Sequence, residues 1–363
     1  ADPVHSAPII NPSAIKESSM CKKATSTPYK TIPVEQAVGL TLAHDMTEVI
    51  PGKSKGPAFR KGHRVRSQDL CRLMKMGKNH LYVLDLKENQ VHEDQAVFEL
   101  ASALSGPGVT FSGSPKEGKL ELRADYKGLF KINREALVDF NMHEDVMCAC
   151  IHDNTVVQKD QSLAGTRAIP LIIDRDRLNK AVKTAKQNYP VCSVKMLNPL
   201  KVRLAITGNE VYKGLIKDRF KQIVEKKVNA LGATLEESVI LPDDRELIAR
   251  QIRSYLDNDT DLIITTGGMS VDPDDVTKAA IEDAGFDRIH YSAAVLPGAM
   301  FLLGYHADTA IMGVPACGLY HDVTVFDLVL PRIAAGEKPD RRSLAELCHG
   351  GLCMNCDPCR FPV

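Results

Sequence analysis

The sequence predicts an α/β protein whose main domain is a three-layer sandwich, with a mainly parallel sheet between two layers of helices. Three observations predict this fold. Apolar runs rich in β-branched residues alternate with amphipathic helical segments between about residues 201 and 336. A glycine pair, Gly267-Gly268, lies between one of these runs and the helix that follows it. Polar or glycine-containing turns follow the runs, as expected at the carboxyl edge of a parallel sheet.

The elements of this domain follow from local patterns. The first helix has apolar side chains with a period of about 3.6 residues and ends at Gly232. The second helix begins at Asp243, with Glu246 three residues later as in a capping box. Strands are predicted at 202–207, 237–241, 262–266, 289–295 and 309–314, and helices at 215–231, from 243, at 275–284 and at 320–335.

The rest of the chain divides into four further parts. Residues 1–19 are rich in proline and serine and are interpreted as a tag or a disordered tail. An N-terminal α/β region is predicted at 20–106 and a small β-rich domain, resembling a β-clip barrel, at 107–198. The sandwich then occupies 199–337, and a cysteine-rich tail occupies 338–363.

Composition excludes several classes of function. The 46 basic and 46 acidic residues cancel, so the chain lacks the basic footprint of a nucleic-acid or membrane-surface protein. No apolar stretch is long enough to span a bilayer. Ten cysteines in 363 residues do not resemble a small secreted disulfide scaffold. We therefore expect a cytoplasmic protein in a reducing compartment, with no nucleic-acid partner and no membrane association.

The glycine pair is the first candidate binding site. It follows a buried strand and precedes a helix that begins near Asp275. Glycine lets the backbone approach a ligand closely, and the amides of such a loop attract an anion, typically a phosphate. The acidic residues beside the loop are candidates for holding Mg²⁺ that bridges to the phosphate. The alternative is a tight turn that binds no ligand.

The tail is the second candidate site. Its cysteines follow the spacing Cys348-x4-Cys353-x2-Cys356-x2-Cys359. Two-residue spacers let neighbouring thiolates converge on one ion, and four thiolates suit either a tetrahedral Zn²⁺ site or one Fe–S cluster. The sequence does not decide between these two. A disordered tail whose thiols pair only after oxidation is the alternative.

Five motifs of the sandwich together resemble a known family. They are Thr207-Gly208-Asn209-Glu210, Asp243-Asp244, Thr265-Thr266-Gly267-Gly268-Met269-Ser270 with Asp275, Pro297-Gly298, and Gly313-Val314-Pro315. This set resembles the molybdenum-cofactor biosynthesis domain, which is shared by molybdopterin adenylyltransferases, molybdopterin molybdenumtransferases and gephyrin. With its tail, the chain is most similar to bacterial molybdopterin-binding proteins that carry a cysteine-rich C-terminal segment.

The resemblance implies a site for molybdopterin or the molybdenum cofactor. It implies acidic catalytic residues at this site, which would be Glu210, Asp243 or Asp244, and Asp275. The implied cofactor-binding residues are Thr207, Gly208, Thr266, Gly267, Gly268, Met269, Ser270, Pro297, Gly298 and Pro315. It also implies a homodimer and a molybdoenzyme as client.

Two departures from the family bear on the reaction. Leu296 and Ala299 flank the Pro-Gly turn, where molybdenum-inserting members usually carry lysines. Cys317 lies in a turn that usually reads Pro-Gly-Asn-Pro. Because molybdate is an anion, the missing lysines favour binding or delivery of the cofactor over insertion of the metal, and whether the chain is an enzyme stays open. The alternative is a Mg-dependent hydrolase or transferase that acts on another phosphorylated, nucleotide-like ligand.

Overall fold

The computed structural model describes residues 29–40, 42–50, 54–60, 63–84, 88–116, 118–269, 276–359 and 361. The chain forms two compact units that divide after Gln90. The boundary expected at residue 106 therefore lies inside the second unit. Among the described residues, each helix is too short or too polar to cross a membrane.

The first unit is a small mixed α/β fold. Strand β1 (Tyr29–Pro33) pairs antiparallel with β4 (His80–Leu84), and β2 (Met46–Ile50) pairs with β3 (Ser54–Phe59). The short helices are η2 (Val34–Gln36), η3 (Ser67–Asp69) and α1 (Leu70–Lys75). Val34, Leu73 and Leu81 are buried in its core.

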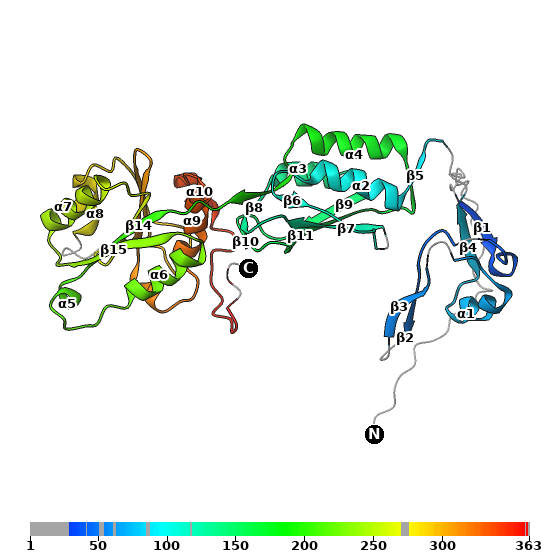
Figure 1. Ribbon diagram of the computed structural model, residues 1–363, viewed down its shortest axis with the longest axis horizontal. Helices are drawn as coiled ribbons and strands as arrows, with labels where there is room; N and C mark the ends of the chain where they lie inside the picture. The colour runs from blue at the N-terminus through cyan, green and yellow to red at the C-terminus, as the bar shows by residue number, and fades with distance from the viewer. Residues whose placement is uncertain are drawn as a thin grey trace, which may run out of the picture. The chain divides into compact units, whose positions relative to one another are not determined.

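Within the described residues, the first part of the second unit contains three helices, two larger sheets and one pair of short strands. Figure 1 shows α2 (Glu93–Leu104), α3 (Arg134–Asn141) and α4 (Arg175–Gln187) on one side of the strands. One sheet has the order β6-β7-β11-β9 and the other β10-β8-β13. Their strands are β6 (Val109–Thr110), β7 (Lys119–Ala124), β8 (Gly128–Ile132), β9 (Val146–Cys150), β10 (Val156–Val157), β11 (Ser162–Ala168) and β13 (Cys192–Met196). The short strands β5 (Gln90–His92) and β12 (Ile172–Asp174) complete this part. These sheets stay open and are covered by helices, so the expected barrel is wrong.

The second part is the predicted sandwich, built on a six-stranded sheet of order β15-β14-β16-β19-β18-β17. Its strands are β14 (Lys201–Thr207), β15 (Thr234–Leu241), β16 (Leu262–Thr266), β17 (Arg288–Tyr291), β18 (Leu302–His306) and β19 (Thr309–Val314). Strands β15, β14, β16 and β19 run parallel to one another. Strand β18 runs antiparallel to both β19 and β17. The sheet is therefore mainly parallel, as predicted.

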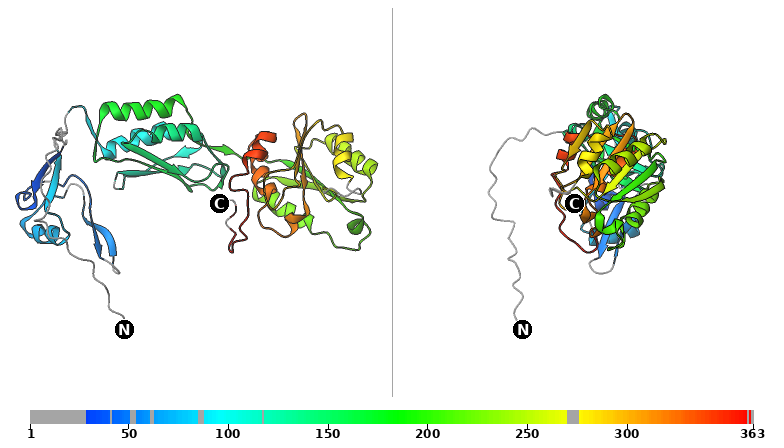
Figure 2. Two further views of the ribbon diagram at one scale, coloured as in Figure 1. Left: turned by 180° about the vertical axis from the view of Figure 1, so that it is seen from behind. Right: turned by 90° about the vertical axis from the view of Figure 1, so that its left-hand side faces the viewer.

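Helices cover both faces of this sheet. On one face, α6 (Phe220–Ala230) and α9 (Val325–Ala334) share a core with Leu204 and Ile264. On the other face, α7 (Arg245–Leu256) and α8 (Thr277–Asp283) pack on Ala205 and Ile263. Successive strand residues point to opposite faces, which explains why neighbours in sequence belong to different cores. Figure 2, seen from behind, shows the yellow helices across the sheet from the orange and red ones.

Several predicted boundaries of the sandwich are wrong. The first helix begins at Phe220 rather than Leu215, because the Asp218 carboxylate accepts the Phe220 and Lys221 amides and caps it there. A separate short helix, α5 (Asn209–Tyr212), precedes it. Asp244, not Asp243, caps α7.

The last part of the sandwich also differs from the prediction. Strand β17 stops at Tyr291, and the last long helix starts at Val325 after the short helix η4 (Ala316–Leu319). The prediction missed strand β18 of the sandwich. It also missed helix α4, which lies in the first part of the unit. A final helix, α10 (Arg341–Glu346), leads into the tail.

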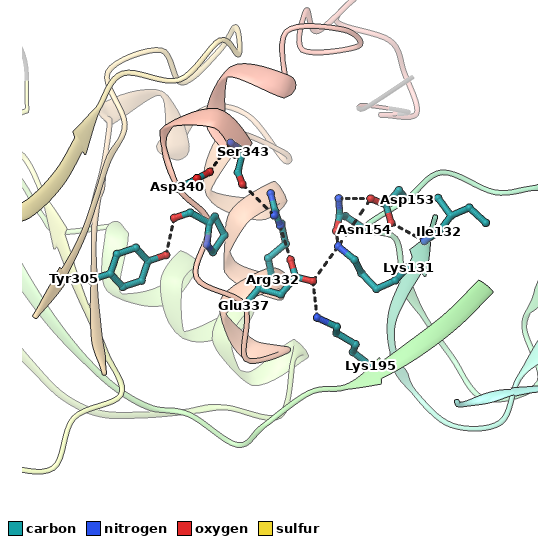
Figure 3. Close-up of polar contacts among 11 residues, drawn as sticks. Lys131, Ile132, Asp153, Asn154, Lys195, Tyr305, Arg332, Glu337, Asp340 and Ser343 are labelled. Carbon is teal, nitrogen blue, oxygen red and sulfur yellow. Dashed lines mark hydrogen bonds and ion pairs between the residues drawn. The ribbon is translucent and has the colours of Figure 1, made fainter. Parts of the chain in front are cut away.

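A partly buried ion cluster joins the two parts of the second unit, and Glu337 lies at its centre. Figure 3 shows this carboxylate between Lys131 on β8, Lys195 on β13 and Arg332 on α9. The nitrogen–oxygen distances are 2.9, 3.0 and 2.9 Å, respectively. The Glu337 side chain is 12% exposed. One carboxylate therefore binds cations from three elements.

Candidate functional site

The candidate site lies where the strand order of the sandwich reverses. Strand β14 is flanked by β15 on one side and β16 on the other, so the connection from β14 to β15 and the connection from β15 to β16 run in opposite directions across the sheet. Ligands of open α/β sheets bind beyond the carboxyl ends of the strands at such a point. Thr207 ends β14, and Thr266 ends β16 beside it. The predicted binding motifs therefore meet at this edge.

Buried threonines hold the two strand ends together. The Thr207 hydroxyl donates to the Thr266 carbonyl oxygen over 3.0 Å and lies 3.1 Å from the hydroxyl of Thr277, the first residue of α8. All three side chains are buried. Each hydrogen bond of this kind contributes about 1 kcal/mol. The end of β14 is thus tied to the strand and to the helix on either side of the glycine loop.

The glycine pair sits tightly on these threonines. Gly267 has φ +85° and Gly268 has φ +57°, a region that L-residues rarely adopt. A Cβ atom at Gly267 would collide with the Thr207 carbonyl oxygen, and one at Gly268 would collide with the Thr277 hydroxyl. The loop therefore needs glycine at both positions for its conformation and for its packing.

The loop forms one wall of a cavity of about 430 Å³. Predicted residues that line the cavity are Gly267, Gly268, Met269, Gly298 and Pro315. Ala299, Met300, Ala316 and Cys317 line it as well. Burial raises the pKa of the Cys317 thiol, so this side chain is neutral at neutral pH. Among the described lining residues there is no lysine, arginine, aspartate or glutamate.

The predicted acidic residues lie beside the cavity rather than in its described wall. Glu210 is exposed, and Asp243 is half-buried with its carboxylate 2.8 Å from the Asn209 amide that donates to it. The Asp244 carboxylate accepts the Leu247 amide at 2.9 Å and caps α7. Asp243 therefore ties the exit of β14 to that of β15. The catalytic role of these three residues remains a prediction.

The remaining predicted residues have different places. Gly208 has φ +144° and continues the main chain from Thr207 into α5, and Thr266 lies directly before the glycine pair. Pro297 precedes the lining residue Gly298. Ser270 and Asp275 lie outside the described residues.

The sequence interpretation missed part of the site. Met300 and Ala316 line the cavity, and each follows a turn that the sequence had marked. Tyr291 was also missed: its hydroxyl donates to the Met269 carbonyl at 2.6 Å. The Lys278 ammonium lies 5.1 Å from the Tyr291 ring, which brings a cation to this side of the loop. No short motif marks a tyrosine or lysine for such a contact.

The cysteines of the tail are not gathered into a ligand cage. Cys353 and Cys356 are half-buried, and Cys348 and Cys359 are exposed. Across the described ranges, no three Cys, His, Asp or Glu side chains are grouped so that they could hold a metal ion. The predicted Zn²⁺ or Fe–S site, and the Mg²⁺ expected near the glycine loop, remain predictions.

Fold and site together define an α/β ligand-binding domain with a glycine loop at its switch point. Residues 204–334 match the family model of a "probable molybdopterin binding domain". This part of the chain is therefore similar to the domains of that family. Residues 31–85 of the first unit match a second model, described as a domain of unknown function.

Curated proteins are similar to limited parts of the chain. The molybdopterin molybdenumtransferase of Haemophilus influenzae is 30% identical over 156 residues, which are 40% of this chain and 37% of that protein. A CinA-like protein of Thermosipho melanesiensis is 39% identical over 74 residues, which are 20% of this chain and 18% of that protein. The chain thus spans well under half the length of these relatives.

Solved structures are similar to a little over a third of the chain. The molybdopterin biosynthesis enzyme MoaB of Thermus thermophilus is 19% identical, with 38% of this chain and 98% of that chain covered and a TM-score of 0.33. The CinA protein of Thermoplasma acidophilum, whose function is described as unknown, is 14% identical, with coverages of 38% and 99% and a TM-score of 0.34.

Proposed function

We propose that the sandwich domain binds molybdopterin, or its AMP-linked form, in molybdenum-cofactor biosynthesis or in delivery to a molybdoenzyme. The observation that carries this proposal is the glycine loop, which forms a wall of a cavity at the carboxyl edge of the sheet, and the described lining residues of this cavity are uncharged. The phosphate of the ligand would lie against Gly267 and Gly268, where the backbone carries no side chain. The flat pterin would lie against Met269, Met300 and Pro315.

An unpartnered polar atom supports a ligand at this place. The Thr266 hydroxyl oxygen is buried and has no hydrogen-bond partner among the described residues. A buried hydroxyl without a partner costs roughly 1–3 kcal/mol, so such groups are rare in folded proteins. Thr266 lies directly before the glycine pair that lines the cavity. A polar ligand group that accepts this hydroxyl would relieve the cost.

The composition of the wall favours binding or delivery over metal insertion. Molybdate is an anion, and the described wall offers it no lysine or arginine. Leu296, where inserting relatives would carry a lysine, is 57% exposed beside the turn. We expect the isolated protein to incorporate little molybdenum into bound pterin. Efficient incorporation from molybdate by this chain alone would refute that part of the proposal.

Co-purification tests the ligand class directly. The protein is expressed in a host that makes the molybdenum cofactor and is purified without oxygen. The expected result is a bound pterin, identified by fluorescence after oxidation and by mass spectrometry. A bound nucleotide without pterin would contradict the proposal and favour the Mg-dependent hydrolase or transferase. Adding EDTA or Mg²⁺ during purification tests the magnesium prediction, which fails if pterin retention is unchanged.

The association state and the client are proposed from the family resemblance alone. We expect a homodimer, and sedimentation of the purified protein at micromolar concentration tests this. A monomeric mass would contradict it. The client is expected to be a molybdoenzyme that takes its cofactor from this domain, and transfer to a cofactor-free molybdoenzyme tests that step.

A further inference from the structure

The cysteine-rich tail is joined to the wall of the candidate cavity. The Leu296 amide donates to the Gly351 carbonyl over 2.8 Å, and the Cys353 amide donates to the Leu296 carbonyl over 2.8 Å. These bonds form a short parallel bridge between Leu296 and Leu352. Leu296 lies two residues before Gly298, which lines the cavity. The position of the tail is therefore coupled through two backbone hydrogen bonds to the turn beside the ligand.

The cysteine segment is held at both ends. At its start, Cys353 packs against the core that α6 and α9 share with the sheet. At its end, Phe361 is 6% exposed and belongs to the same core. Cys356 and Cys359 lie between these two anchors. A loop fixed at both ends loses less conformational entropy when it binds an ion than a free tail would.

The backbone bends directly after Cys353. The Asn355 amide donates to the Cys353 sulfur over 3.4 Å, and Asn355 has φ +51°. The Cys353 thiol in turn lies 3.8 Å from the Asn355 side-chain oxygen. Cys353 therefore has a fixed place on the tail, three residues before Cys356.

We propose that this tail binds one Zn²⁺ through Cys348, Cys353, Cys356 and Cys359, and that the bound ion fixes the turn at 296–298 beside the cavity. Four thiolates satisfy tetrahedral zinc, which has no geometric preference of its own from d-electrons. Since no three such donors are grouped among the described residues, binding draws the exposed Cys348 and Cys359 inward. The bound metal thus holds the tail in place, and the tail holds the turn at 296–298 beside the cavity.

Metal analysis of the full chain tests the site. The protein is purified under reducing, oxygen-free conditions, and its metals are counted by mass spectrometry. We expect about one equivalent of zinc per chain, and Co²⁺ in its place should give the charge-transfer bands of tetrahedral thiolate ligation. Cys356→Ser should lose the metal. Cys71→Ser, which removes an exposed cysteine of the first unit, should keep it.

Hydrogen–deuterium exchange tests whether zinc binding fixes the turn at 296–298. Adding zinc should slow amide exchange in peptides that contain Leu296 and Cys353, whereas Cys356→Ser should show no slowing. Less than about a tenth of an equivalent of zinc, iron with sulfide in its place, or equal binding by Cys356→Ser would overturn the site. Zinc binding without slower exchange at Leu296 would contradict the claim that the ion fixes the turn. None of these readouts needs a pterin, so their failure is distinct from failure of the proposed function.

Discussion

Replacing Glu337 by glutamine should lower the free energy of unfolding, because Glu337 joins the two parts of the second unit. Burial raises the pKa of Glu337, but hydrogen bonds from the three surrounding cations outweigh burial and lower it from 4.5 to about 2. Each pH unit of such a difference corresponds to about 1.4 kcal/mol. The ionised carboxylate therefore stabilises the folded state by about 3 kcal/mol at neutral pH. Glu337→Gln should remove much of this stabilisation, because it leaves Lys131 and Arg332, which are largely screened from solvent, without their counter-charge.

The pH dependence follows from the direction of the shift. A carboxylate whose pKa is lowered on folding contributes its full stability above the unfolded value near 4.5. This contribution is lost as pH falls from there through about 2, where the folded carboxylate takes up its proton. The wild-type protein should therefore lose stability over this range, and Glu337→Gln should lack that component. The two proteins should converge at the acid end.

Urea unfolding followed by far-UV circular dichroism measures both effects, because the chain has no tryptophan for fluorescence. Glu346→Gln is the matched control. Glu346 pairs with Arg342 at 2.9 Å, but its side chain is 63% exposed. Exposed pairs contribute about 0–1 kcal/mol, so this variant should unfold nearly as the wild type does. Equal destabilisation by both variants, or a Glu337→Gln difference that stays constant down to pH 2, would refute the reasoning.

Two further predictions concern the candidate site. Thr207→Val removes the hydroxyl that bonds the Thr266 carbonyl, so it should lower the free energy of unfolding by roughly 1–3 kcal/mol and weaken ligand binding. Thr309→Val, which removes a 2.8 Å hydrogen bond at the opposite edge of the same sheet, should lower stability but leave binding unchanged; equal loss of binding would contradict the role of Thr207. Burial raises the pKa of Cys317, so iodoacetamide should modify it at neutral pH more slowly than the exposed Cys71, as peptide mass spectrometry can measure. Faster modification of Cys317 would show that the cavity wall is open and charged.

The sequence predicted the centre of the sandwich because packing there follows a simple pattern. Strand β16 is buried along its whole length, and its apolar, β-branched residues end at a glycine pair. Such a run between turn signals leaves few alternatives. Strand β18 was missed because Gly304 interrupts a short run that carries no turn signal of its own. Its strand character comes from pairing with β17 and β19, which is a tertiary contact.

The start of helix α6 depends on a polar side chain, and the spacing of apolar residues does not reveal such a side chain. Leu215 and Ile216 continue the period of the first helix, yet they are 75% and 59% exposed and lie outside it. The Asp218 carboxylate accepts the Phe220 and Lys221 amides where the helix begins. Helix α4 was missed because the whole region at 107–198 was predicted to be β-rich.

The candidate site was predictable where main-chain conformation defines it and hidden where tertiary packing does. The glycine loop and the turns at Gly298 and Pro315 carry local signals, and the structure brings them around one cavity. The contact of Tyr291 with Met269, and the bridge from Leu296 to the tail, join segments far apart in the chain. Spacing within one segment carries no information about such contacts.

The central claim is that the cavity at the glycine loop binds a phosphorylated pterin. Anaerobic fluorescence titration with metal-free molybdopterin tests it most directly, with Gly268→Val compared against Gly232→Val. Both glycines have positive φ, but a side chain at Gly232 meets no atom within 4 Å, whereas one at Gly268 meets Thr277. We predict that the wild type and Gly232→Val bind alike and that Gly268→Val binds at least about tenfold more weakly. Equal affinity of all three proteins, or no binding by the wild type, would contradict the account.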